Sequence, residues 1–195
     1  MLTLYRLIAR MGKRPSFVDS SDAVIELHGD EIRSFCGSAL SDAWIAWDLK
    51  HDEWFNDEPV ILRFGNRNFE ASFNQLSQFA MTIDSVDITA PPNWMDCFDG
   101  MPLAWRNNAH ESLKRTIGNT LWDVAIVDYL FRTTVVEDSV DPSRCGTQSE
   151  SWSLHALEFK FDACSLVLYN ALDENGLQTE PLAGDDISKR WLSTV

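Results

Sequence analysis

Apolar and polar residues alternate along much of the chain, which predicts a protein built mainly of antiparallel β-strands. The clearest case is a hairpin in which every second residue of 60–64 and of 69–73 is apolar and 65–68 are turn formers. Arg63 and Glu70 fall on the opposite face of this hairpin. We therefore expect a sheet with one face in water.

The same reasoning predicts a second long hairpin near the C-terminus. Residues 152–161 alternate, whereas the return strand 164–170 is apolar on both faces and is expected to be covered on both sides. Asn175-Gly176 is a strong turn signal after it. Further strands are predicted at 23–28 and 31–36, joined by a turn at Gly29-Asp30, and at 43–49, 78–84 and 120–136.

Two short helices are predicted. In residues 1–14, apolar positions recur at helical spacing and four cations occur without an acid. This pattern is typical of a helix that binds a membrane or a partner, and also of a short helix docked on an acidic body. We expect the docked helix. The second helix is predicted at 109–117, with Asn108 as its N-cap and Gly118 at its end.

A weak internal repeat links the two hairpins. Residues 60–76 and 157–172 both contain a strand ending in Phe, a short turn, a return strand and an aromatic–Asn pair followed by Leu. The predicted fold class is α+β, mainly β, with two related β-rich halves. The expected divisions are an N-terminal half (1–84), an acidic and aromatic linker (85–102) and a C-terminal half (103–195), together forming one compact unit.

The charge restricts the partners of this protein. Its 195 residues carry a formal charge of −14 yet are 45% hydrophobic, a composition typical of a packed globular protein. Direct binding to nucleic acid is disfavoured, and no apolar run approaches the roughly 20 residues of a membrane-spanning helix. Arg6 and Arg10 interrupt the opening segment, which argues against a secretory signal. We therefore expect a cytoplasmic protein whose four separated cysteines are free, mostly buried thiols.

No cofactor or metal signature is present, and only one candidate for enzymatic chemistry stands out. Glu158-Phe159-Lys160 on a strand, with Asp141 or Asp138 upstream, resembles the metal site of restriction-type nucleases. In such a site two carboxylates hold Mg²⁺ and a lysine stabilises developing charge. The same pattern is also typical of solvated strand positions, and the net negative charge opposes a nuclease.

Acids interleaved with large apolar residues form two segments, 47–58 and 84–102, which hold five and four acids respectively. Aromatic anchors ringed by acids are typical of a binding site for a basic protein. The alternative is that the same apolar residues fold back onto the core and the acids keep the protein soluble. The predicted contact residues, including a third acidic patch near the C-terminus, are Asp52, Glu53, Trp54, Asp57, Glu58, Trp94, Asp96, Phe98, Asp99, Asp173 and Glu174.

The run from Leu168 to Leu177, after the strand LEFKF, resembles a passage of small acidic bacterial proteins, some of which are similar to immunity proteins of polymorphic toxin systems. The resemblance covers residues 152–181 and, faintly, 60–87. It implies a bacterial cytoplasmic origin and an inhibitory-binding role, and it carries no catalytic residues.

The sequence therefore predicts a non-catalytic acidic protein that binds and neutralises a basic partner, in particular a toxin domain. Such a protein is drawn to a cationic cleft by long-range attraction and blocks it. Two alternatives stay open: a metal-dependent hydrolase or nuclease that uses Glu158 and Lys160, and a structural subunit that assembles with itself.

Overall fold

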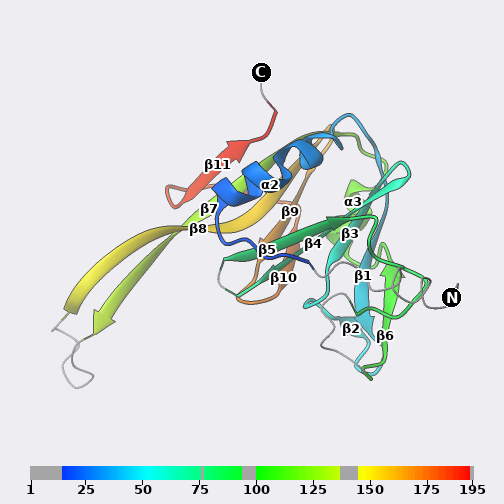
Figure 1. Cartoon of the computed structure of the whole chain (residues 1–195), viewed down its shortest axis with the longest axis horizontal. Coiled ribbons are helices and arrows are strands. Elements are labelled where there is room, and N and C mark those ends of the chain that lie inside the picture. Colours follow the sequence, from blue (N-terminus) through cyan, green and yellow to red (C-terminus); the bar gives the residue numbers. More distant parts are fainter. Residues whose placement is uncertain (1–14, 76, 94–99, 137–144, 194–195) are drawn as a thin grey trace, which may run out of the picture.

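The protein is mainly β, as the alternation predicts, and its described residues form two antiparallel sheets and two short helices (Figure 1). The computed structural model describes residues 15–75, 77–93, 100–136 and 145–193. The predicted N-terminal helix at 1–14 lies outside these residues. Neither described helix is long and apolar enough to cross a membrane.

The first sheet has the strand order β2-β1-β3-β4-β5, with β6 also paired to β1. Its strands are β1 (Leu40–Asp48), β2 (Glu53–Trp54), β3 (Val60–Phe64), β4 (Arg67–Asn74), β5 (Gln78–Ile83) and β6 (Leu103–Asn107). β6 begins at the start of the predicted C-terminal half but belongs to the first sheet. The strands predicted at 43–49, 60–64, 69–73 and 78–84 are confirmed within one to three residues.

The second sheet has the order β10-β9-β8-β7-β11. Its strands are β7 (Leu121–Val136), β8 (Cys145–Phe161), β9 (Ser165–Asn170), β10 (Asn175–Gln178) and β11 (Ile187–Trp191). The predicted turn at Asn175-Gly176 is wrong, because both residues lie in β10 and the turn precedes them. Gly176 is required there: a Cβ on it would lie 2.3 Å from the Cζ atom of Tyr169, whose ring covers the glycine.

The hairpin predicted over 23–36 is wrong, because these residues form helix α2 (Ser21–Arg33). The side chain of Ser20 accepts a hydrogen bond from the backbone N–H of Ala23 and caps the helix. Val24 and Ile32, eight residues apart, are both fully buried on one side of it. The N-cap and this spacing are signals of a helix, whereas the hairpin was predicted from Gly29-Asp30 as a turn.

Helix α3 (Glu111–Thr116) confirms the predicted second helix in a shorter form. Its cap is His110, whose Nδ1 accepts from the backbone N–H of Ser112. The side chain of Asn108, the predicted cap, instead accepts from the backbone N–H of Ala43 at 3.0 Å. Gly118 follows the helix with φ +86°, as expected for a glycine at a helix C-terminus.

The two sheets close on one shared apolar core. Phe69 of β4 lies edge-to-face on Phe159 of β8 with ring centroids 5.5 Å apart, and Phe64 of β3 stacks on Phe161 at 6.5 Å. The rings of the first sheet and those of the second are therefore buried against each other. The two sheets therefore share one core.

The expectation that the first hairpin has one face in water is wrong. Ile61 and Glu70, on the face away from the shared core, are both completely buried. The Glu70 carboxylate accepts hydrogen bonds from the backbone N–H groups of Ser85 at 3.0 Å and Val86 at 2.9 Å. The start of the predicted linker therefore packs on this face and satisfies the buried carboxylate.

The return strand of the second hairpin is covered on both sides, as predicted. Leu166 and Leu168 face the shared core, and Val167 belongs to a smaller buried cluster on the other face. Residues of β7 and β8 complete that smaller cluster, against which Leu182 and Ile187 pack.

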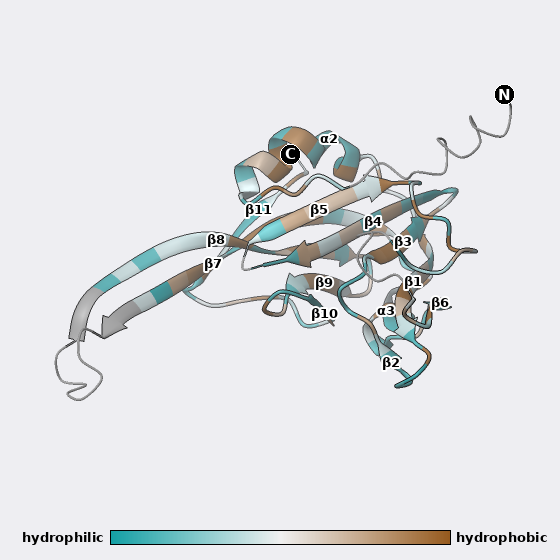
Figure 2. Cartoon of the chain, turned by 60° about the horizontal axis from the view of Figure 1, so that its bottom comes forward, coloured by the Kyte–Doolittle hydropathy of each residue, from teal (hydrophilic) through white to brown (hydrophobic). Residues whose placement is uncertain are grey.

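Strands β7 and β8 are much longer than their neighbours. β11 pairs with β7 only as far as Tyr129, and β9 pairs with β8 only from Ala156 onwards. Beyond these residues β7 and β8 pair with each other in a two-stranded ribbon that projects from the body (Figures 1 and 2). Trp152 lies on this ribbon with half of its surface exposed.

The order of elements agrees with the predicted repeat, which remains a prediction. Helix α2 precedes the meander β1-β3-β4-β5, and helix α3 precedes the meander β7-β8-β9-β10. The two similar sequence segments correspond to β3–β4 and β8–β9, which are the two central strands of each meander.

Candidate functional site

Three segments from distant parts of the chain meet around the buried side chain of Asn175, which is 1% exposed. Its Oδ1 accepts from the backbone N–H of Phe73 at 2.8 Å. Its Nδ2 donates to the carbonyl oxygens of Asn56 at 2.8 Å and Glu58 at 3.0 Å, and to the hydroxyl of Ser72. One amide therefore joins the β2–β3 loop, β4 and β10.

Asn170, the cross-strand partner of Asn175, extends this network. Its Nδ2 donates to the carbonyl of Gln75 in the β4–β5 turn, and its Oδ1 accepts from the backbone N–H of Asp173 at 3.0 Å. The two asparagines thus hold residues 55–57, 75 and 171–174 together. We call the exposed part of these residues the turn surface.

The turn between β9 and β10 presents an apolar side chain to solvent. Leu172 and Asp173 have φ of +63° and +79°, and the backbone N–H of Ala171 donates to the carbonyl of Glu174 at 2.8 Å. Two such central residues define a type I′ turn, which usually carries Asn-Gly because positive φ is unfavourable for other residues. Leu172 is nevertheless 74% exposed. A strained backbone therefore supports an exposed leucine directly before two acidic residues, Asp173 and Glu174.

One carboxyl group of the turn surface responds to a neighbouring carboxylate. Partial burial raises the pKa of Asp57, and the nearby negative charge of Glu174 raises it further. These two predicted contact residues therefore lie close together although they are far apart in the sequence. Among the described residues no cation pairs with Asp57, Asp173 or Glu174.

The remaining predicted contacts do not form one surface with these. The side chain of Asp52 accepts from the Nε1 of Trp47 and pairs with Arg106, both at 2.9 Å, and these bonds hold its pKa below the usual value. Trp54 is half-buried, with its ring 5.4 Å from that of His110.

The other predicted positions divide into three groups. Glu53 is exposed in β2, at the edge of the first sheet. Glu58 is completely buried, so its side chain takes no part in the turn surface. Four predicted contacts lie outside the described residues: Trp94, Asp96, Phe98 and Asp99.

The residues of the enzymatic alternative are engaged with other parts of the protein. Glu158 is buried, pairs with the Nζ of Lys189 at 2.6 Å and accepts from the backbone N–H of Leu182. The Nζ of Lys160 lies 5.8 Å from the centre of the Trp191 ring. Asp138 and Asp141 lie outside the described residues. In the described part of the chain, no three His, Cys, Asp or Glu side chains are grouped as metal ligands.

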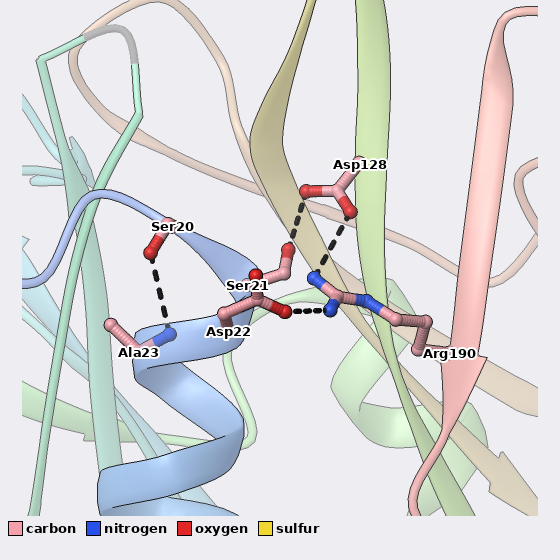
Figure 3. Close-up of polar contacts among 6 residues, drawn as sticks. All are labelled: Ser20, Ser21, Asp22, Ala23, Asp128 and Arg190. Carbon is pink, nitrogen blue, oxygen red and sulfur yellow. Dashed lines mark hydrogen bonds and ion pairs between the residues drawn. The ribbon is translucent and has the colours of Figure 1, made fainter.

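A polar cluster that the sequence reasoning missed ties helix α2 to the second sheet. Figure 3 shows the Ser21 hydroxyl and the Arg190 guanidinium both bonded to the carboxylate of Asp128, while Arg190 also pairs with Asp22. The Arg190–Asp128 distance is 3.3 Å. Asp128 thus pairs with a cation and accepts from the serine, an arrangement that fixes α2, β7 and β11 relative to one another.

The thiols and histidines show the effect of burial. Cys36 and Cys164 are free and half-buried, and burial raises the pKa of both thiols. The side chains of Cys97 and Cys145 lie outside the described parts. His155 lies between Tyr129 and Tyr169, with ring centroids at 5.5 and 6.0 Å, and burial lowers its pKa.

Comparisons with protein-family models, curated proteins and solved structures gave no match to this chain.

We expect Asn175→Ala to lower the free energy of unfolding by about 3 kcal/mol, because the Phe73 N–H and the Asn56 and Glu58 carbonyls would lose a buried partner. Gln178→Ala, which removes one exposed side-chain bond to the Glu180 carbonyl, serves as the control. Urea unfolding of both variants measures the difference. Equal stability of the two variants would show that Asn175 does not join the turns energetically.

The raised pKa of Asp57 predicts a pH-dependent stability. A carboxyl group whose pKa is raised by folding destabilises the folded state when it is ionised. The free energy of unfolding therefore falls as pH rises through the folded pKa. We expect Asp57→Asn to be more stable than the parent protein at pH 7 and to lose this advantage below the ordinary aspartate pKa of 3.8. Thermal unfolding from pH 3 to pH 7 measures the effect, and a constant difference across this range contradicts it.

Proposed function

We propose that this chain is a binding protein that neutralises a basic partner protein, in particular a bacterial toxin domain, by covering it with the turn surface. The role requires no chemistry from the chain itself. The observation that carries the proposal is the effect of Glu174 on the pKa of Asp57, two acids of the surface that also carries the exposed Leu172.

The electrostatic argument rests on an unfavourable arrangement in the free protein. Two nearby carboxylates repel each other, and each favours the protonated form of its neighbour. A partner's lysine or arginine placed between them removes this repulsion and gains two ion pairs. The free protein is thus preorganised for a cation that its described residues do not supply.

The remaining features of the turn surface support a protein partner rather than a small ion. Leu172 offers an exposed apolar contact on the surface that also carries Asp57, Asp173 and Glu174, and apolar contacts beside charged groups are typical of protein interfaces. The buried amides of Asn170 and Asn175 hold the turns rigid, so little conformational entropy is lost when a partner binds. The net charge of −14 increases the rate of encounter with a cationic cleft.

A charge-neutralised variant tests this proposal. We expect Asp57→Asn, Asp173→Asn and Glu174→Gln together to slow association with a basic effector encoded by a neighbouring gene by about tenfold at low salt. Increasing salt should likewise lower the association rate of the parent protein, since exposed charges are screened over about 8–10 Å. Association rates from biolayer interferometry and growth rescue in co-expression are the two measurements.

A second triple variant, Glu26→Gln, Glu180→Gln and Asp185→Asn, changes the net charge equally but lies away from the turn surface. It should retain the association rate of the parent protein within about twofold if the attraction is local. Equal slowing by both variants would assign the effect to net charge alone and remove the turn surface from the proposal.

The self-assembling alternative is favoured by one observation, the ribbon of β7 and β8. In the described residues, the two strands form a ladder only with each other beyond Leu130, whose N–H donates to the Asp186 carbonyl, and before Ala156. The outer edges of this part of the ribbon can therefore accept another strand. An isolated two-stranded ribbon is marginally stable in water, and free edges are templates for pairing with another strand.

Self-association through this ribbon predicts a dimer or larger species in size-exclusion chromatography with light scattering. Ser149→Lys with Trp152→Lys places two charges on the β8 part of the ribbon and should reduce the mass to that of one chain. Leu27→Lys on the exposed face of α2 is the control. A monomeric parent protein at micromolar concentration contradicts this alternative.

A further inference from the structure

A tryptophan at the start of β7 is held in solvent by an irregularity of the sheet. Leu121 pairs with Phe161 and Asp123 with Lys160, so Trp122 is an extra residue in the ladder, a β-bulge. Bulges redirect side chains, and here the indole of Trp122 is 66% exposed whereas Leu121 beside it is buried. The bulge thus places a large aromatic surface outside the core.

Trp122 lines an open hollow with a volume of about 430 Å³, together with Gly37, Thr120, Leu121 and Asp162. Asp162 belongs to the turn between β8 and β9, and its backbone N–H donates to the carbonyl of Thr120 at 3.1 Å, which fixes the turn against β7. In the described part of the chain no cation pairs with the Asp162 carboxylate. The hollow therefore combines an indole with an unpaired carboxylate.

The same two groups hold an arginine elsewhere in this protein. The guanidinium of Arg106 lies 4.3 Å from the centre of the Trp47 ring and 2.9 Å from the carboxylate of Asp52. Arg63 likewise lies over Trp44 at 4.3 Å. An indole and a carboxylate suit a guanidinium because it is planar, charged and weakly hydrated, so it stacks on the ring and donates to the carboxylate together.

We propose that Trp122 and Asp162 form a binding site for the side chain of an arginine from another protein. The guanidinium stacks on the indole and donates hydrogen bonds to the carboxylate, as Arg106 does within the chain. The site stands apart from the turn surface, since the turns that carry Asp162 and Asp173 lie at opposite ends of β9. It therefore exists independently of the function proposed above.

The test uses the full chain and N-acetyl-arginine methylamide as the probe. In two-dimensional ¹H–¹⁵N NMR the indole N–H signal of Trp122, identified as the one lost in Trp122→Phe, should shift progressively with the probe. The citrulline analogue has the same shape without charge and should bind at least about fivefold more weakly. The lysine analogue should also bind more weakly, since an ammonium lacks the planar fork.

Two substitutions define the site, and a third is the matched control. Trp122→Ala and Asp162→Asn should each weaken binding about fivefold or more, measured by shifts of backbone signals around the hollow. Trp152→Ala removes another exposed tryptophan and should leave binding unchanged. Binding of the citrulline analogue as strong as that of the arginine probe, unchanged binding in both hollow variants, or an absence of shifts would each overturn the proposal. None of these outcomes depends on the turn surface.

Discussion

Burial of the facing phenylalanine rings between the two sheets is the interaction on which the rest of the structure depends. Each sheet has strands that are apolar on the face toward the other, and Val24 and Ile32 of helix α2 join the same core. The rings of Phe69 and Phe159 meet across this layer. Because interior packing is dense and specific, this contact fixes the position of one sheet on the other. The loops at the sheet ends are consequently brought to defined places.

The polar groups at one end of the sheets follow from that arrangement. The β2–β3 loop and the β9–β10 turn come together because β3 and β9 belong to the two packed sheets. Asn175 then satisfies backbone groups that would otherwise be buried without partners. The acids of these loops are close to one another as a result of the core packing, despite their repulsion.

The strands were predictable because their signal is local. The candidate site was not predictable, since its contacts join residues that are far apart in the sequence. Alternation over five to eight residues was enough to place β3, β4 and β5 correctly. Helix α2 was missed because its β-branched residues resemble a strand over six residues, although its capped start and its buried positions eight residues apart indicate a helix. Asp57 and Glu174 are close in space because the two sheets pack together, and no local sequence pattern predicts that packing. The exposure of Leu172 was not predicted, because the turn was predicted at Asn175-Gly176, three residues after its actual position.

The hairpin of β9 and β10 joins two positions with opposite tolerance to change. At Gly176 the ring of Tyr169 occupies the place of any side chain, so no other residue fits there unless the ring moves. Four residues earlier, Leu172 projects into solvent, and other side chains would fit that space. Substitutions at Leu172 can therefore change the exposed turn while the strands of the hairpin stay the same. A binding protein whose partner changes in sequence would require such a position.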